Sequence, residues 1–328
     1  MRTPAKNPPP QRNQPDPAAE SPGSNGAIEA HPYLALVGAA LCFAGNIIVG
    51  RALEGMVPPF ALTFWRWLLV VAILLPLTWN TLWRHRALIR RHWVLLTTLG
   101  TGSVTLYNGL FYLGVQQSSA INGALLTSSI PLLIALCAFV ITRERLANRQ
   151  AAAIGLSLIG ILAIIARGDP AVLLNIRFGG GDLWILAASL CWAVYSVLLR
   201  FSPRELSGLP FVCISSIAGV ITILPVYFWE LNTGATVTIG PASIGGIVFL
   251  AIFPALLAYL LYSKAVPVVG PNRAGLFLHL SPVFAIAAAI LFLDESLRGY
   301  HLFGVSVIAL GLYLNTQGPT MRRTGASK

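Results

Sequence analysis

The chain has 328 residues, of which 56% are apolar and only 10% are charged, and its mean hydropathy is +0.74. A soluble globular protein carries roughly 25% charged residues, so this composition excludes an ordinary soluble domain. The formal net charge of +11 would suit nucleic-acid binding in a soluble protein, but here the positive residues lie in short segments between apolar runs. That placement orients membrane helices, and it argues against a nucleic-acid partner.

Apolar runs long enough to cross a bilayer recur along the chain. A helix needs about 20 apolar residues to cross a hydrocarbon core of roughly 30 Å, and lipid forces each span to bond its own backbone. The sequence predicts ten helical spans, at 33–53, 57–79, 93–115, 120–142, 150–166, 181–200, 208–229, 241–263, 272–293 and 300–316. The polar segment 1–31 is predicted to be a disordered tail, and residues 318–328 are predicted to form a second, shorter tail.

Lysine and arginine residues are divided unequally between the two sides of the predicted bundle. With a cytoplasmic N-terminus, most of the 22 fall in inside segments. The exceptions are Arg66, within a span, and Arg51, Arg167, Arg177 and Arg298, on the outside. The positive-inside rule therefore predicts that both termini, and hence both tails, are cytoplasmic.

The two halves of the chain match one another. At an offset of 151, residues 131–160 align with residues 282–311 without a gap. The aligned pairs include Pro131 with Pro282, Glu144 with Glu295, Leu146 with Leu297, and Gly160 with Gly311. A shared richness in Leu, Ala and Ile is the alternative explanation, but the coincident proline, glutamate and glycine favour duplication.

Because each half has an odd number of spans, the second half must enter the membrane from the opposite side to the first half. Such inverted repeats place a substrate site near the midplane, where the halves meet. The sequence thus predicts an all-α membrane protein with ten transmembrane helices in two inverted five-helix repeats, at 33–166 and 181–317.

Three segments resemble the EamA type of the drug/metabolite transporter superfamily. Residues 181–195 are similar to the start of the second repeat of that family, and residues 129–146 and 281–297 resemble its repeat endings, an SP…GE.L…G signature. Arg143 and Asp294 stand where the family usually has glycine. The resemblance implies a secondary transporter of small organic solutes, often an exporter of amino acids, in a bacterial-type inner membrane.

Arg66 is the charged residue predicted to lie near the middle of a span. A guanidinium at that depth costs about 2.5–3.5 kcal/mol on insertion scales and is retained when it has a partner. In one interpretation Arg66 binds a substrate carboxylate in a water-filled cavity. In the other it is structural and bonds backbone carbonyls of a neighbouring helix or pairs with Glu54 or another acid at a span end.

Polar and aromatic side chains recur at helical spacing within several spans and are predicted to line one cavity. The predicted substrate-binding residues are Asn46, Arg66, Thr105, Asn108, Tyr112, Trp192, Tyr195, Tyr259, Tyr262 and His279. In the repeat, an offset of 149 pairs Asn46 with Tyr195, and the offset of 151 pairs Asn108 with Tyr259 and Ser128 with His279. Any single one of them could instead bond one helix to another. The set suits an aromatic or large apolar amino acid better than an anionic sugar or a lipophilic cation.

His279 is the candidate for proton coupling, because histidine changes its charge near neutral pH and no acid lies within the spans. A neutral histidine bonded to a carbonyl is the structural alternative, so transport without proton coupling stays open. Pro131 and Pro282 interrupt the backbone at equivalent points and are candidate hinges; equally, they could only bend their helices.

Motifs for other classes of membrane protein are missing from the sequence. It has neither paired carboxylates nor HExxH, and its four cysteines lie inside apolar runs without metal-ligand spacing. We therefore expect that the protein is not an enzyme and uses no cofactor or metal. We expect an exporter that lies in the lipid bilayer and moves a small-molecule substrate by alternating access, as a monomer or weak dimer. The alternative is a multidrug or other metabolite exporter driven by proton exchange.

Overall fold

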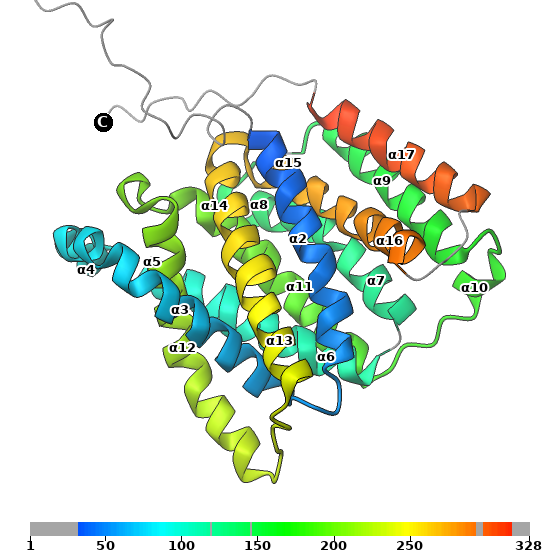
Figure 1. The fold of residues 1–328 in the computed structure, drawn as a ribbon. Coiled ribbons are helices and arrows are strands. Elements are labelled where there is room, and N and C mark those ends of the chain that lie inside the picture. The colour runs from blue at the N-terminus through cyan, green and yellow to red at the C-terminus, as the bar shows by residue number, and fades with distance from the viewer. Residues whose placement is uncertain (1–31, 119, 145, 293–297, 317–328) are drawn as a thin grey trace, which may run out of the picture.

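The computed structural model describes residues 32–118, 120–144, 146–292 and 298–316, which form a bundle of helices (Figure 1). Seven helical stretches among these residues are long and apolar enough to cross a membrane. They contain α2 (Pro32–Ala52), α3 (Pro59–Arg84), α7 (Ala120–Ser128) with α8 (Ile130–Thr142), α9 (Asn148–Ala166), α11 (Gly180–Leu198), α12 (Leu209–Asn232), and α13 (Pro241–Leu250) with η4 (Ala251–Leu257) and α14 (Ala258–Val269). The prediction of an all-helical, multi-pass membrane protein is confirmed.

The other three predicted spans coincide with helical stretches that are not among those seven. These are α5 (Trp93–Gly100) with the π-helical segment η1 (Thr101–Asn108) and α6 (Gly109–Gln117); α15 (Pro271–Leu276) with the 3-10 turn η5 (Phe277–His279) and α16 (Leu280–Phe292); and α17 (Gly299–Thr316). Ten crossings therefore stay a prediction. Both predicted tails, and Glu295 of the second repeat ending, lie outside the described residues.

Helices from the first half of the chain pack mainly against helices from the second half. The packed pairs are α3 with α12, α9 with α17, α2 with α14, α6 with α11, and α8 with α15. Figure 1 shows α9 and α17 side by side at one edge of the bundle. The middle of the bundle is thus bounded by both halves of the chain.

Glycines allow α9 and α17 to touch through their backbones. A Cβ atom at Gly160 would lie 2.6 Å from the carbonyl oxygen of Gly304, and one at Gly311 would lie 2.7 Å from the carbonyl oxygen of Ala153. Membrane helices associate without a hydrophobic driving force, so small residues that permit close backbone approach stabilise such pairs.

The N-terminus of α3 is capped by a residue from the far end of α12. No side chain of its own segment caps α3, which begins after Pro58. Instead, the buried Glu230 carboxylate accepts hydrogen bonds from the backbone N–H of Phe60 at 3.1 Å and of Ala61 at 2.7 Å. A negative charge there also interacts favourably with the helix dipole. The cap therefore fixes the helix that carries Arg66 against α12.

Replacing Glu230 by alanine should lower the unfolding midpoint in detergent, because two N–H groups of α3 lose their acceptor. Loss of a helix cap costs about 0.5–2 kcal/mol. The exposed Glu205 provides a matched control, since Glu205→Ala removes an acid that makes no helix cap. A Glu230→Ala midpoint equal to that of Glu205→Ala would contradict the capping role.

Candidate functional site

Arg66 lies on α3, only 1% exposed, and its guanidinium is surrounded by neutral polar side chains. Its Nη1 donates to Asn46 Oδ1 at 2.8 Å and to the Tyr112 hydroxyl, and its Nη2 donates to Asn108 Oδ1 at 2.9 Å. No carboxylate among the described residues forms an ion pair with it. Arg66 is thus a buried charge held by oxygen dipoles from α2, η1 and α6 rather than by a counter-ion.

The hydrogen bonds continue beyond Arg66 into the second half of the chain. The Tyr112 hydroxyl donates to Asn46 Oδ1 at 2.7 Å, and Asn108 Nδ2 donates to the Tyr259 hydroxyl at 3.1 Å. Tyr259 donates in turn to the backbone carbonyl of Ser103 at 2.9 Å. We call Arg66, Asn46, Asn108, Tyr112 and Tyr259 the arginine network.

The partners of Arg66 differ from the structural partners expected from the sequence. Its hydrogen bonds go to side-chain oxygens, whereas backbone carbonyls and Glu54 were the expected alternatives. An amide oxygen can accept from two donors, and Asn46 Oδ1 does so here, from Arg66 and from Tyr112. Neutral acceptors therefore satisfy most of the guanidinium and leave its positive charge uncompensated.

A cavity of about 80 Å³ adjoins the arginine network at Asn46. Its walls are Phe43, Asn46, Tyr107, Phe111, Ala124, Thr127, Ser128, Ile130, Trp192, Leu278, His279, Ser281 and Pro282. These residues come from α2, η1, α6, α7, α8, α11, η5 and α16, so both halves of the chain enclose it. One water occupies about 30 Å³ of liquid, so in this conformation the cavity has room for a few waters or a small polar group.

Three of the ten predicted substrate-binding residues line this cavity: Asn46, Trp192 and His279. The candidate hinge Pro282 lines it as well. Arg66, with Asn108, Tyr112 and Tyr259, lies behind Asn46 in the arginine network and not on the cavity wall.

The other three predicted residues lie around the site without lining the cavity. The rings of Tyr195 and Tyr262 each pack 5.2 Å from the Trp192 ring, between centroids. Thr105 instead binds α12, where its hydroxyl donates to the Gly219 carbonyl at 3.0 Å and lies 2.6 Å from Thr222 Oγ1. Tyr195 and Tyr262 thus form a second layer behind Trp192, and Thr105 joins two helices.

A π-helical segment explains why Thr105 and Asn108 point to different neighbours. The sequence pattern predicts one shared face for Thr101, Thr105, Asn108 and Tyr112, on the assumption of an α-helix. Residues 101–108 are π-helical instead, with one more residue in each turn. Thr101 and Thr105 therefore face Thr222, while Asn108 and Tyr112 face Arg66.

His279 places an unpartnered nitrogen next to the cavity. Its Nε2 lies 2.9 Å from the backbone carbonyl oxygen of Ser128, which can only accept, so Nε2 carries a hydrogen. Its Nδ1 is buried and makes no hydrogen bond to a described residue. In the neutral ring this nitrogen is a free acceptor.

Several cavity residues were not predicted from the sequence: Phe43, Tyr107, Phe111, Thr127, Ser128 and Ser281. Tyr107 and Phe111 directly precede Asn108 and Tyr112 and are four residues apart, so their helical spacing could have indicated a second cavity-facing stripe. Ser128 could have been found as the repeat equivalent of His279. Phe43 gave no signal, because an apolar ring in an apolar span is indistinguishable from a lipid-facing one.

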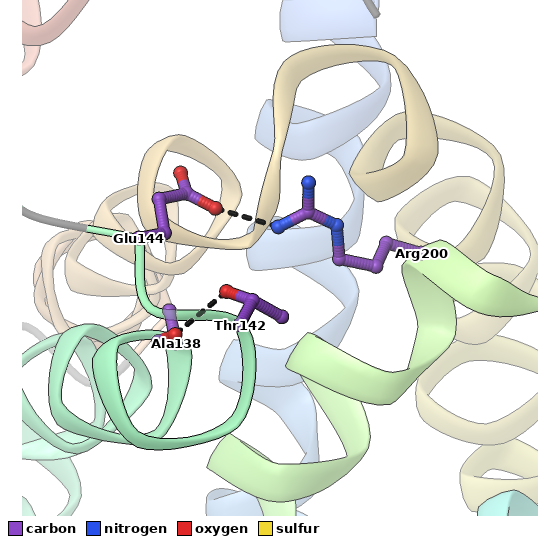
Figure 2. Close-up of polar contacts among 4 residues, drawn as sticks. All are labelled: Ala138, Thr142, Glu144 and Arg200. Atoms are coloured by element: carbon purple, nitrogen blue, oxygen red, sulfur yellow. Dashed lines mark hydrogen bonds and ion pairs between the residues drawn. The ribbon is translucent and has the colours of Figure 1, made fainter. Parts of the chain in front are cut away.

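An ion pair joins the end of α8 to the turn after α11. Arg200, in the turn after α11, donates from Nη1 to Glu144 Oε2 at 2.5 Å, as Figure 2 shows. Glu144 follows Arg143, whose left-handed backbone (φ 56°) ends α8 and turns the chain. The two side chains are 31% and 12% exposed, so the pair is partly screened by solvent. It joins the first repeat ending to the second half of the chain.

Comparison with known proteins gives the family. The profile of the EamA-like transporter family matches residues 31–166 and 179–317. The chain is 25% identical over 280 residues to the uncharacterized transporter YyaM of Bacillus subtilis, covering 85% of this chain and 92% of YyaM. It is 29% identical over 201 residues to a protein of Salmonella typhimurium named "probable amino-acid metabolite efflux pump", covering 58% of this chain and 65% of that one.

A solved crystal structure has the same fold, with a TM-score of 0.70 at 19% identity over 88% of this chain and 97% of that chain. Among the described residues of this chain, no group of His, Cys, Asp or Glu is arranged to hold a metal ion. The family match extends over both halves of the bundle and therefore over every wall of the cavity. The chain belongs to the EamA-like transporter family, within the drug/metabolite transporter superfamily, and is a membrane transporter rather than an enzyme.

Proposed function

We propose that this protein exports amino acids with aromatic or large apolar side chains, by alternating access around the cavity. The observation that carries the proposal is the lining of the cavity. Aromatic rings form one part of the wall, and the amide of Asn46 and the imidazole of His279 supply polar groups. A solute with a polar head and an apolar side group fits such a wall. The names of the Salmonella and Escherichia coli relatives, amino-acid metabolite efflux pumps, agree with this substrate class.

The proposal includes two inverted repeats, 33–166 and 181–317, with five spans each. Two hydrogen bonds support it, because they join residues that an offset of 151 makes equivalent. One runs from Asn108 to Tyr259 and the other from His279 to Ser128. Equivalent residues meet face to face only near a twofold axis, so these bonds suit a pseudo-twofold axis next to the cavity. The packing of α3 with α12 and of α9 with α17 fits the same axis.

Alternating access needs a closed end and a hinge. We propose that the protein lies in an inner membrane with both termini cytoplasmic, so that the Glu144–Arg200 pair closes the cytoplasmic end. Pro131 and Pro282 suit a hinge, because each follows an interruption of its span. Ser129 separates α7 from α8, and the 3-10 turn η5 separates α15 from α16. Opening at these breaks would enlarge the cavity, whose present volume of about 80 Å³ is too small for a whole amino acid with a large side chain.

Uptake into proteoliposomes tests the proposed function. We expect saturable uptake of L-phenylalanine, L-tryptophan or L-leucine by the purified protein. Repeating the assay with and without a pH gradient decides the coupling, because uptake that ignores the gradient removes His279 as a proton coupler. Uptake of organic cations without uptake of any amino acid would refute the proposed substrate class.

Glu144→Gln should favour opening of the cytoplasmic end, because it removes the ion pair with Arg200 (Figure 2). A partly exposed pair contributes about 0.5–1 kcal/mol, so labelling of a cysteine introduced at Ser128 should rise about two- to fivefold. The reagent is a membrane-impermeant maleimide added from the cytoplasmic side, in a background without the four native cysteines. The exchanged pair Glu144→Arg with Arg200→Glu should restore slow labelling; equal labelling of all three proteins would exclude the gate.

A further inference from the structure

The cavity presents two polar groups whose hydrogen-bonding directions are fixed by their neighbours. Asn46 Oδ1 accepts from Arg66 Nη1 and from the Tyr112 hydroxyl. A flipped amide would set its own NH₂ group against the guanidinium, donor against donor, so this orientation is required. Asn46 Nδ2 makes no hydrogen bond to a described residue, and its N–H groups are what the side chain can offer to the cavity.

His279 offers the opposite polarity. Its Nε2–H is committed to the Ser128 carbonyl, and its Nδ1, in a side chain only 2% exposed, has no partner. Leaving a buried acceptor unpaired costs about 1–3 kcal/mol. That cost is recovered when a ligand donates to the nitrogen. Asn46 and His279 therefore give the cavity wall a donor group and an acceptor that lie on different halves of the chain, beside the unpaired indole N–H of Trp192.

We propose that the cavity binds the head group of a zwitterionic α-amino acid, with Asn46 Nδ2 donating to its carboxylate and its ammonium donating to His279 Nδ1. This assignment rests on the proposed function and specifies how the same site recognises its substrate. The carboxylate and the ammonium of such a ligand are both attached to its α-carbon, which suits a small cavity with Asn46 and His279 on its wall.

Arg66 is a positioning residue in this arrangement. It does not line the cavity, but it holds Asn46 Oδ1 and so aims Nδ2 away from itself. Its uncompensated charge also raises the potential next to the bound carboxylate, which favours an anion in a site of low dielectric constant. The side group of the substrate then extends along the aromatic wall formed by Phe43, Tyr107, Phe111 and Trp192.

Two substitutions at His279 separate its two nitrogens. The amide of glutamine reaches the position of Nε2, so His279→Gln keeps a donor for the Ser128 carbonyl and removes the acceptor at Nδ1. The amide of asparagine reaches the position of Nδ1, so His279→Asn keeps the acceptor and loses the bond to Ser128. Asn46→Asp provides the third variant, because it keeps Oδ1 for Arg66 and replaces the donating NH₂ by an acceptor.

The experiment measures binding of L-phenylalanine, phenylalaninamide and 3-phenylpropionate to the purified full-length protein in detergent. The parent should prefer L-phenylalanine to both analogues. Phenylalaninamide lacks the carboxylate, and 3-phenylpropionate lacks the ammonium. His279→Gln and Asn46→Asp should each weaken L-phenylalanine binding about tenfold to a hundredfold, as expected for a lost hydrogen bond to a charged group. His279→Asn should stay within about threefold of the parent. His301→Gln, at a buried histidine of α17 outside the cavity, should bind like the parent.

The outcomes separate this assignment from the proposed function. Equal binding of all three ligands by the parent overturns the head-group assignment and leaves amino-acid transport standing. If His279→Gln binds L-phenylalanine like the parent and His279→Asn binds it more weakly, the proposed role of Nδ1 is overturned. Failure of the parent to bind or transport any amino acid overturns both. Unfolding midpoints, measured alongside, show that each variant is folded.

Discussion

Under the proposed head-group assignment, Arg66→Ala should abolish discrimination between amino acids and their amides and should lower the stability of the protein. The substitution leaves the amide oxygens of Asn46 and Asn108 without their charged donor in a buried site. Buried acceptors without partners cost about 1–3 kcal/mol each, so we expect a loss of about 2–4 kcal/mol, reduced where Tyr112 continues to donate to Asn46. Asn46 Oδ1 is then held by the Tyr112 hydroxyl alone, so the donor that Asn46 presents to the cavity is less firmly fixed.

Transport of L-phenylalanine and of its amide, together with the unfolding midpoint, measures this effect. Arg90→Ala, at an exposed arginine of the short helix α4 (Arg86–Arg91), is the control and should leave both properties unchanged. Arg66→Lys keeps the charge but has a single ammonium where the guanidinium serves three acceptors, so it should recover only part of the function. An alanine variant that discriminates like the parent would show that Arg66 serves the fold alone.

Gly160→Ala should disrupt the pairing of α9 and α17, because its new Cβ would lie 2.6 Å from the carbonyl oxygen of Gly304. The obstacle is backbone, so no side-chain rotation relieves it and the helices must separate. Overpacking of this kind costs about 1–3 kcal/mol, and the lost close contact along the helix pair places Gly160→Ala at the upper end.

Gly155→Ala is a matched control on the same helix. A Cβ at Gly155 meets no atom within 4 Å, and alanine raises helix propensity by about 1 kcal/mol, so this variant should be as stable as the parent or slightly more stable. The unfolding midpoint in detergent and the monodisperse fraction after size exclusion compare the two. Equal behaviour of both alanine variants would mean that the α9–α17 contact contributes nothing to stability.

The sequence was sufficient for the parts of the fold that depend on composition and period. Apolar runs predicted where the helices lie, and α9 begins and ends within a few residues of the predicted span 150–166. The family motifs pointed to the family that the comparisons show. These features are local, so each can be recognised from a short stretch of sequence.

Features that depend on distant partners could not be derived in the same way. The cap on α3 comes from Glu230, about 170 positions away along the chain, and no local pattern links the two segments. Thr105 and Asn108 were predicted to share one helix face, but they point to different neighbours because residues 101–108 are π-helical. A search for the α-helical period does not detect π-helical backbone. Similarly, Arg66 was found because of its unusual position, but its partners and its place behind Asn46 depend on how α2, α3 and α6 pack.

A fixed positive charge without a counter-ion has a consequence for leakage. Any transporter that opens to water on alternate sides risks conducting protons or sodium ions along the wetted path. A cation that approaches the cavity meets the field of Arg66, which no nearby described carboxylate neutralises and which the low dielectric constant of the bundle strengthens. Arginine residues and helix dipoles exclude cations from other membrane pores in this way. We therefore expect the guanidinium that bonds Asn46 to lower passive cation flow through the protein as well.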